Sequence, residues 1–218
     1  MKKSAYGSLH LKALIGGLGG VLLLIFGQLT LASENEAPTF DHSHALWNGV
    51  LKKYVGYEGT QGATAQTRVR YSELKKDQTD FNAYLQRVEK VSAVEFSRFS
   101  EPQKLAFLIN AYNALTVKLV VDHYPVKSIK EIGGIFSSPW KLKFFTLFGE
   151  KHRLDDIEHE MVRKNFNEPR IHFALVCASK GCPALRQEAF VADKLDAQLE
   201  SAAVTFLKDF FIAARIAK

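Results

Sequence analysis

The sequence lacks the short motifs of most nucleotide-dependent, hydrolytic and metal-dependent enzymes. It contains no G-x-S-x-G nucleophile elbow, no glycine-rich phosphate-binding loop, no dinucleotide-binding fingerprint and no H-E-x-x-H zinc motif. The sequence therefore gives no support to cofactor-dependent chemistry. We expect neither a cofactor nor a resident metal.

Long runs of one charge are also missing. Lysine and arginine number 29 and aspartate and glutamate 23, a formal net charge of +6, yet no block of five like charges and no basic stripe interleaved with aromatic residues occurs. Nucleic-acid-binding domains concentrate their positive charge in such patches. We therefore do not expect nucleic acid to be a partner.

Cysteine is scarce, since the chain has only Cys177 and Cys182, but apolar residues are plentiful. With 218 residues, 47% of them hydrophobic and 16 of them phenylalanine, the chain can bury one sizeable core. We expect a single domain over residues 41–218. A polar, proline-containing stretch over residues 33–40 suits a linker that precedes it.

The first 32 residues have the features of an export signal. Three lysines precede an apolar run over residues 13–26, and Ala32 ends a small-residue stretch at the usual cleavage spacing. The alternative is an uncleaved anchor over residues 13–32, close to the ~20 residues that span a bilayer. Both place the domain in the periplasm or outside the cell, and only an uncleaved segment would contact the membrane.

Hydrophobic residues recur at helical spacing in four long segments, each of which we expect to form a helix with one face in the core. Two short runs of β-forming residues joined at Gly149 and Glu150 predict a β-hairpin. Together these patterns predict an α+β fold of helices packed around a small, largely antiparallel sheet. The four helices are expected to begin near Asp41, Thr79 or Asp80, Ser100 and Asp193.

The third of these helices should be the buried centre of the fold. Ser100 and Gln103 match a capping box, and the chain is apolar almost all round from there to His123, where a Tyr-Pro pair follows. Asn110 and Asn113 lie three apart on one face of this helix. Buried amides need hydrogen-bond partners. The two residues therefore either hold the backbone of a neighbouring loop or contact a ligand.

The stretch over residues 169–190 holds both cysteines and a histidine. Residues 171–177 are apolar apart from His172 and rich in β-formers, which predicts a buried strand in the sheet. Pro183 suits the first position of a helix, so Cys182 would be its N-cap. The helix dipole at that position favours a thiolate.

Three segments, FLINAYNALTVKLV, LDDIEHEMVR and IHFALVCASKGCPALR, resemble in this order the domain-of-unknown-function family 547. The resemblance covers roughly residues 71–210 and implies a compact domain but no particular reaction. Family members commonly continue past the last helix into a segment with aromatic and acidic positions, whereas this chain ends at Lys218. We therefore expect it to be C-terminally truncated relative to the family.

The two cysteines allow three alternatives. The first is a short-loop disulfide between Cys177 and Cys182, since an exported protein meets an oxidising compartment. The second is a nucleophilic Cys182 with His172 or His159 as the general base. The third is a zinc site on the H-x4-C-x4-C spacing of His172 and the cysteines, which does not match the usual zinc patterns.

A further group of polar residues follows the predicted hairpin. Asp155 and Glu158 match a helix N-cap and its partner three residues on. His159 and Arg163, four residues apart, would then share a face that either meets an anionic group or faces solvent. The candidate binding residues are thus Asn110, Asn113, Glu158 and Arg163.

These observations favour an exported binding or structural module without catalytic activity, in which the cysteines are bridged or buried. The alternative is a thiol-dependent hydrolase or transferase acting on amide or ester bonds, with Cys182 attacking and His172 or His159 as the base. The state of the thiols separates the two, because a bridged cysteine has no thiolate.

Overall fold

The computed structural model describes residues 39–57, 66–133, 138–179 and 181–216. The predicted export segment and most of the predicted linker lie outside these ranges. The elements in chain order are α1 (Ala45–Tyr54), β1 (Val55–Tyr57), β2 (Thr67–Val69), α2 (Tyr71–Lys76), α3 (Thr79–Lys90), α4 (Ala93–Ser97), α5 (Glu101–His123), η1 (Ile129–Glu131), η2 (Pro139–Lys141), β3 (Phe145–Leu147), β4 (Glu150–His152), η3 (Asp156–Arg163), η4 (Pro169–Phe173), η5 (Ala192–Lys194) and α6 (Leu195–Ile216).

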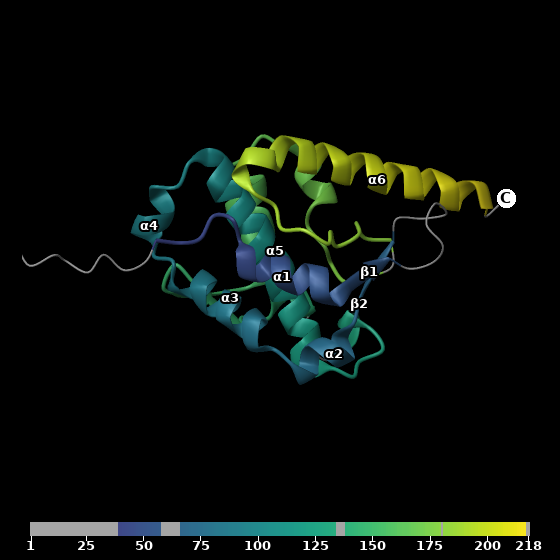
Figure 1. The fold of residues 1–218 in the computed structure, drawn as a ribbon, viewed down its shortest axis with the longest axis horizontal. Helices are drawn as coiled ribbons and strands as arrows, with labels where there is room; N and C mark the ends of the chain where they lie inside the picture. The colour runs from purple at the N-terminus through teal and green to yellow at the C-terminus, as the bar shows by residue number, and fades with distance from the viewer. Residues whose placement is uncertain (1–38, 58–65, 134–137, 180, 217–218) are drawn as a thin grey trace, which may run out of the picture. The chain divides into compact units, whose positions relative to one another are not determined.

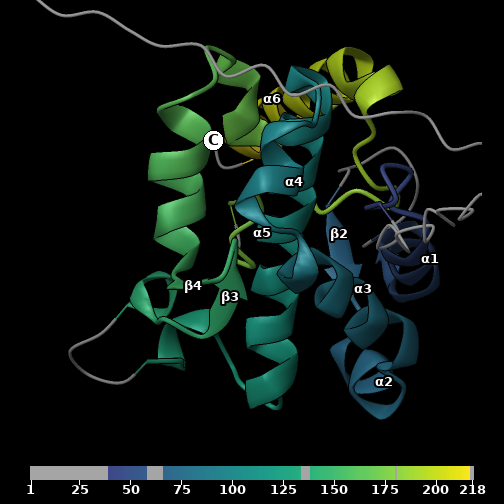
Figure 2. The same ribbon diagram turned by 90° about the vertical axis from the view of Figure 1, so that its left-hand side faces the viewer.

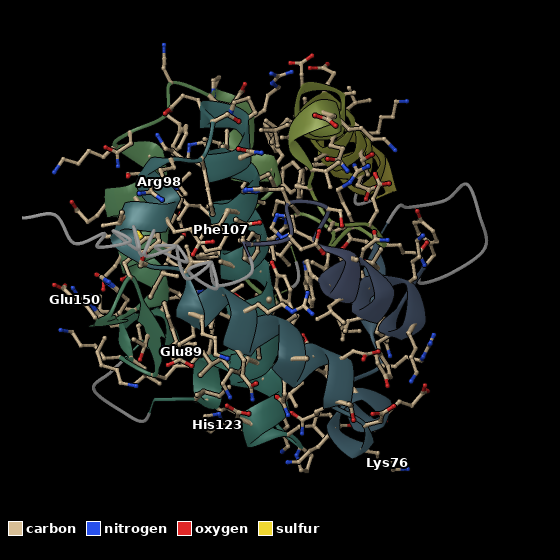
Figure 3. All side chains as sticks on the ribbon, turned by 60° about the vertical axis from the view of Figure 1, so that its left-hand side comes forward. Lys76, Glu89, Arg98, Phe107, His123 and Glu150 are labelled. Carbon is tan, nitrogen blue, oxygen red and sulfur yellow. A yellow bond between two sulfur atoms is a disulfide. The ribbon has the colours of Figure 1, made fainter. Side chains whose placement is uncertain are left out.

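Helix α5 is the centre of the fold, as the sequence predicts (Figures 1 and 2). The Gln103 side chain accepts from the Ser100 N–H at 2.9 Å and the Ser100 hydroxyl accepts from the Gln103 N–H at 3.4 Å, so the predicted capping box is present. Every residue from 105 to 117 is buried. Figure 3 shows Phe107 of this helix in the interior. Within the described ranges α5 alone is long and apolar enough to cross a membrane, but 89% of its most apolar window is buried inside the fold, as in a soluble core helix.

The α+β class and the antiparallel pairing are confirmed, but the expected single sheet is two separate two-stranded sheets. Strands β1 and β2 pair with each other, and β3 pairs with β4 so that Phe145 lies opposite His152. The predicted hairpin turns one residue earlier than expected, at Phe148 and Gly149. Their φ angles of 54° and 85° fit the type I′ turn, which needs positive φ at both positions.

Two predicted elements between residues 169 and 190 are wrong. Residues 171–177, expected as a strand, begin inside the 3₁₀ helix η4 and continue without regular structure. The helix expected from Pro183 does not form, so Cys182 is not a helix N-cap, and the chain runs irregularly until η5. This segment thus needs partners other than a β ladder or helical hydrogen bonds for its backbone.

Asn110 and Asn113 supply those partners. The Asn113 Nδ2 donates to the Ala174 carbonyl at 2.9 Å and its Oδ1 accepts from the Val176 N–H at 2.9 Å. The Asn110 Nδ2 donates to the Phe190 carbonyl at 2.7 Å and its Oδ1 accepts from the Phe190 N–H at 3.0 Å. Each amide gives one donor and one acceptor, as a neighbouring strand would. An apolar segment is therefore held against α5 without a sheet.

Other amide side chains extend this arrangement along the same segment. Asn48 of α1 accepts from the Ala189 N–H at 3.1 Å. Gln198 of α6 accepts from the Val191 N–H and donates to the Ala189 carbonyl, both at 2.9 Å. The segment before η5 is therefore fixed from three sides, by α1, α5 and α6.

Helix α1 begins at Ala45, four residues later than expected, with His44 at its N-cap, but the Asp41 carboxylate still hydrogen-bonds the first turn. The Asp41 carboxylate accepts from the N–H groups of Ser43 and Ala45 at 3.0 and 3.1 Å. His44, the residue before the helix, is 1% exposed, and its Nδ1 lies 2.9 Å from the Tyr84 hydroxyl. Burial lowers the pKa of His44 to about 3. The imidazole is therefore neutral in the folded protein at neutral pH.

His44 should make stability depend on pH. Its pKa falls from 6.5 to about 3 on folding, so between these values the unfolded chain binds more protons and the free energy of unfolding decreases as pH drops. The loss should approach about 1.4 kcal/mol per pH unit. Burial also lowers the pKa of His42, which acts in the same direction. Urea denaturation from about pH 7 to about pH 5 should therefore show a steeper loss for wild type than for His44→Gln. The exposed His159→Gln variant should retain the wild-type slope, and equal slopes for all three proteins would contradict this account.

Asn110→Ala removes both partners of the Phe190 backbone and leaves its buried N–H and carbonyl unsatisfied. We expect the free energy of unfolding to decrease by about 2–4 kcal/mol, measured by urea denaturation. The matched control is Asn82→Ala, at an exposed position of α3, which should change stability by less than about 0.5 kcal/mol. Equal effects of the two substitutions would show that the amide contributes little.

Candidate functional site

Cys177 and Cys182 form a disulfide, the first of the three alternatives. Their Cα atoms are 6.0 Å apart, inside the range of about 4.4–6.8 Å that the bond allows. The bond closes a tight loop, in which Ala178 and Gly181 have positive φ angles of 50° and 87°. Neither sulfur is a thiolate or a zinc ligand in this state. In the described parts of the chain no three His, Cys, Asp or Glu residues are grouped as metal ligands would be.

The disulfide loop forms one wall of a cavity of about 370 Å³, here called the loop cavity. Strand β2 and helix α5 also contribute residues to its lining. Asn113, which fixes Ala174 and Val176, also lines it, so the same side chain shapes the wall and holds it in place. The polar residues that face the loop cavity besides Asn113 include Gln66, Thr67, Arg68, Thr116, Lys127 and Ser179.

The charged residues among the described lining of the loop cavity are both positive. Arg68 and Lys127 line it, and none of the described lining residues is an aspartate or glutamate. Tyr71 lines it too, and burial raises the pKa of this phenol to about 12, which keeps it neutral. The cavity is therefore suited to negative rather than positive ligands.

Thr116 is a site residue that the sequence patterns did not single out. It is 1% exposed, lines the loop cavity, and its hydroxyl has no hydrogen-bond partner in the described part of the protein. A signal was present, because Asn110, Asn113 and Thr116 are polar at every third position of an otherwise apolar segment. Such spacing places polar groups along one helix face.

A second cavity, of about 430 Å³, lies between residues 184–188 and α6. Here positive and negative groups occur together, and Arg186 already donates to Glu188 at 2.5 Å. Thr67 and Leu185 line both cavities, and the Thr67 hydroxyl donates to the Leu185 carbonyl at 2.8 Å. Among the described lining residues, this larger cavity therefore offers charges of both signs, whereas those of the loop cavity are positive.

Glu158, Arg163 and His172 are brought together, but not as expected. Element η3 is a π-helix, whose hydrogen bonds join residue i to i+5, so Glu158 and Arg163, five apart, stack on one face and their side chains pair at 2.8 Å. Glu158 therefore does not cap the helix; it accepts from the Tyr112 hydroxyl at 3.1 Å. His159 and Arg163, expected to share a face, are both exposed on η3, and the anionic group that Arg163 meets is the Glu158 carboxylate.

These contacts form a chain from the core to the surface. Burial first, and then the charge of Glu158, raise the pKa of Tyr112 far above its ordinary value, so Tyr112 donates as a neutral phenol. At the other end the Arg163 Nη2 donates to the His172 Nδ1 at 3.0 Å. Because a guanidinium nitrogen can only donate, the Nδ1 of His172 is the acceptor in this contact.

The structure does not assemble the thiol and imidazole pair. Cys182 lines the loop cavity, whereas neither His172 nor His159 does. His159 is exposed on η3, and no hydrogen bond or ion pair of its side chain occurs within the described residues. His172 is exposed and engaged by Arg163.

The fold and site define an α+β domain in which a disulfide-closed loop forms one wall of a positively charged cavity. A family model described as "Protein of unknown function, DUF547" matches residues 96–207. The match spans half of the chain and all three resembling segments. The chain belongs to this family. No curated protein and no solved structure matches the chain.

Two threonines of the loop cavity should respond to valine in opposite ways. Thr116→Val removes a buried hydroxyl that has no partner and should raise the free energy of unfolding by about 1 kcal/mol. Thr67→Val removes the donor to the Leu185 carbonyl and should lower it by about 1 kcal/mol. Both changes keep the branched shape, and urea denaturation measures both. Changes of the same sign would show that hydrogen bonding does not distinguish the two sites.

Proposed function

We propose that this protein is an exported, non-catalytic binding module whose ligand site is the loop cavity. The observation that carries the proposal is the Cys177–Cys182 bond. The bond closes a loop that lines the cavity, and a bridged cysteine cannot attack a substrate. The site offers polar groups in a concave setting, as small-molecule sites do.

Hydrogen bonds that hold the cavity wall in place support a binding role. Asn113 fixes the backbone of Ala174 and Val176 just before the disulfide loop, and Thr67 holds Leu185 just after it. Fixing a site before the ligand arrives reduces the ordering that binding costs. Hydrogen bonds on both sides of a covalent bridge suit a preformed receptor.

Export is part of this proposal, with the lysines and apolar run of residues 1–32 as its sequence basis. Structural disulfides persist in oxidising compartments and are rare in the cytosol. The bridge and the N-terminal sequence thus favour the same location.

The thiol-enzyme alternative requires a reduced Cys182 with an imidazole beside it. Mass-spectrometric alkylation of the exported protein should label neither cysteine until a reductant is added, and then both. The intact mass in the same sample should match cleavage after Ala32. The reduced protein should hydrolyse p-nitrophenyl acetate no faster than its Cys182→Ser variant. Cys177→Ser, which frees the Cys182 thiol, is the matched control. Labelling of Cys182 without reductant, together with ester hydrolysis that Cys182→Ser abolishes, would contradict the binding module and favour a thiol-dependent enzyme.

A further inference from the structure

We propose that the loop cavity binds a small amphipathic carboxylate, an apolar body that carries one negatively charged end. The inference rests on the proposed binding function and adds the chemical class of the ligand. Two features of the cavity support it independently: the sign of its charged groups and a buried hydroxyl that lacks a partner.

The charge at the cavity is positive and includes an uncommitted cation. Lys127 is exposed where the chain leaves α5, and its ammonium makes no hydrogen bond or ion pair within the described residues. Glu131 lies nearby, since its carboxylate accepts from the Lys127 backbone N–H at 3.3 Å, but Glu131 does not line the cavity. Arg68 lines the same cavity. A ligand carboxylate would therefore find two cations and no like charge on the lining.

Part of the remaining lining is aliphatic. Val69, Val117 and Val176 come from β2, α5 and the segment before the disulfide, and Leu185 comes from the segment after it. A volume of about 370 Å³ lies near the lower end of the range of small-molecule pockets, about 300–1,000 Å³. A small apolar body fills such a space better than a bare inorganic anion, which would leave the aliphatic walls without contacts.

Thr116 supplies the second feature. Thr116 lines the cavity and is 1% exposed, and its hydroxyl has no partner among the described residues. A hydroxyl can donate to a carboxylate oxygen. Binding of a carboxylate there would satisfy a group that the free protein leaves unsatisfied.

A carboxylate on an apolar body occurs in two sources, a free carboxylic acid and the C-terminus of a peptide. The test therefore uses benzoate and its uncharged analogue benzamide, and N-acetyl-alanyl-phenylalanine with a free or an amidated C-terminus. Amide chemical shifts of the labelled exported protein report binding during each titration. We expect saturable shifts at Thr116, Val176 and Lys127 with one or both carboxylates, and at least about tenfold weaker binding of each amide.

Substitutions test the cation and the hydroxyl. Lys127→Gln should weaken carboxylate binding about tenfold, while Lys130→Gln, an equal change of charge at an exposed residue outside the cavity, should change it by less than about twofold. Thr116→Val should weaken binding about fivefold without loss of the folded spectrum. Equal effects of the two lysine substitutions would overturn the assignment of the cation.

The outcomes separate this inference from the function on which it rests. If benzamide and the amidated peptide bind the cavity as tightly as the carboxylates, the protein is a binding module but the anionic ligand class is wrong. If none of the four compounds, nor inorganic phosphate, shifts the cavity residues, the loop cavity is not a ligand site and both proposals fail. Tighter binding of benzoate than of the free-acid peptide would identify small acids as the source, and the reverse a peptide C-terminus.

Discussion

The paired hydrogen bonds that asparagine side chains on α5 make to irregular backbone are the constraint on which this fold depends. An asparagine amide offers one acceptor oxygen and two donor hydrogens, so one side chain can satisfy both a carbonyl and an N–H. Asn113 and Asn110 do this for the chain on either side of the disulfide loop. Burial of an unpaired backbone group costs free energy, so without these amides residues 174–190 could not lie where they do.

The candidate site follows from the same geometry. Because Asn113 and Thr116 lie on one face of α5, the helix that anchors the loop also provides part of the cavity lining. The disulfide then joins the two ends of that loop, and Thr67 of β2 fixes the chain beyond it. The disulfide, helix α5 and strand β2 therefore all hold the chain at the cavity. This explains how a segment without regular structure can form a defined wall.

The elements that the sequence predicted well are those determined by local pattern. The apolar spacing of α3 and the capping box of α5 involve residues within a few positions of one another. Both helices begin where these local patterns predict. The prediction of a strand over residues 171–177 failed because no neighbouring strand is available to pair with this segment. Its partner is Asn113, about sixty positions earlier, and no local pattern contains that contact.

The site was predictable only in part for similar reasons. Pro183 permits a helix start but does not form one, and the helix capping assumed for Cys182 depended on it. The candidates Glu158, Arg163 and His172 do lie together, yet their pairing required the winding of η3, and an apolar pattern does not separate π from α. No residue near Lys127 in the sequence indicates a binding site, since Lys127 reaches the cavity only through the fold.

The π winding of η3 also bears on how the length of this segment can vary among relatives. Glu158 and Arg163 stack because five positions separate them in a helix with i to i+5 hydrogen bonds. Loss of one residue between them, such as the exposed His159, would leave them four apart, the spacing that an ordinary α-helix stacks. A single-residue deletion here would thus exchange one helix type for the other while the ion pair persists, so an alignment gap at this point need not signal a lost contact.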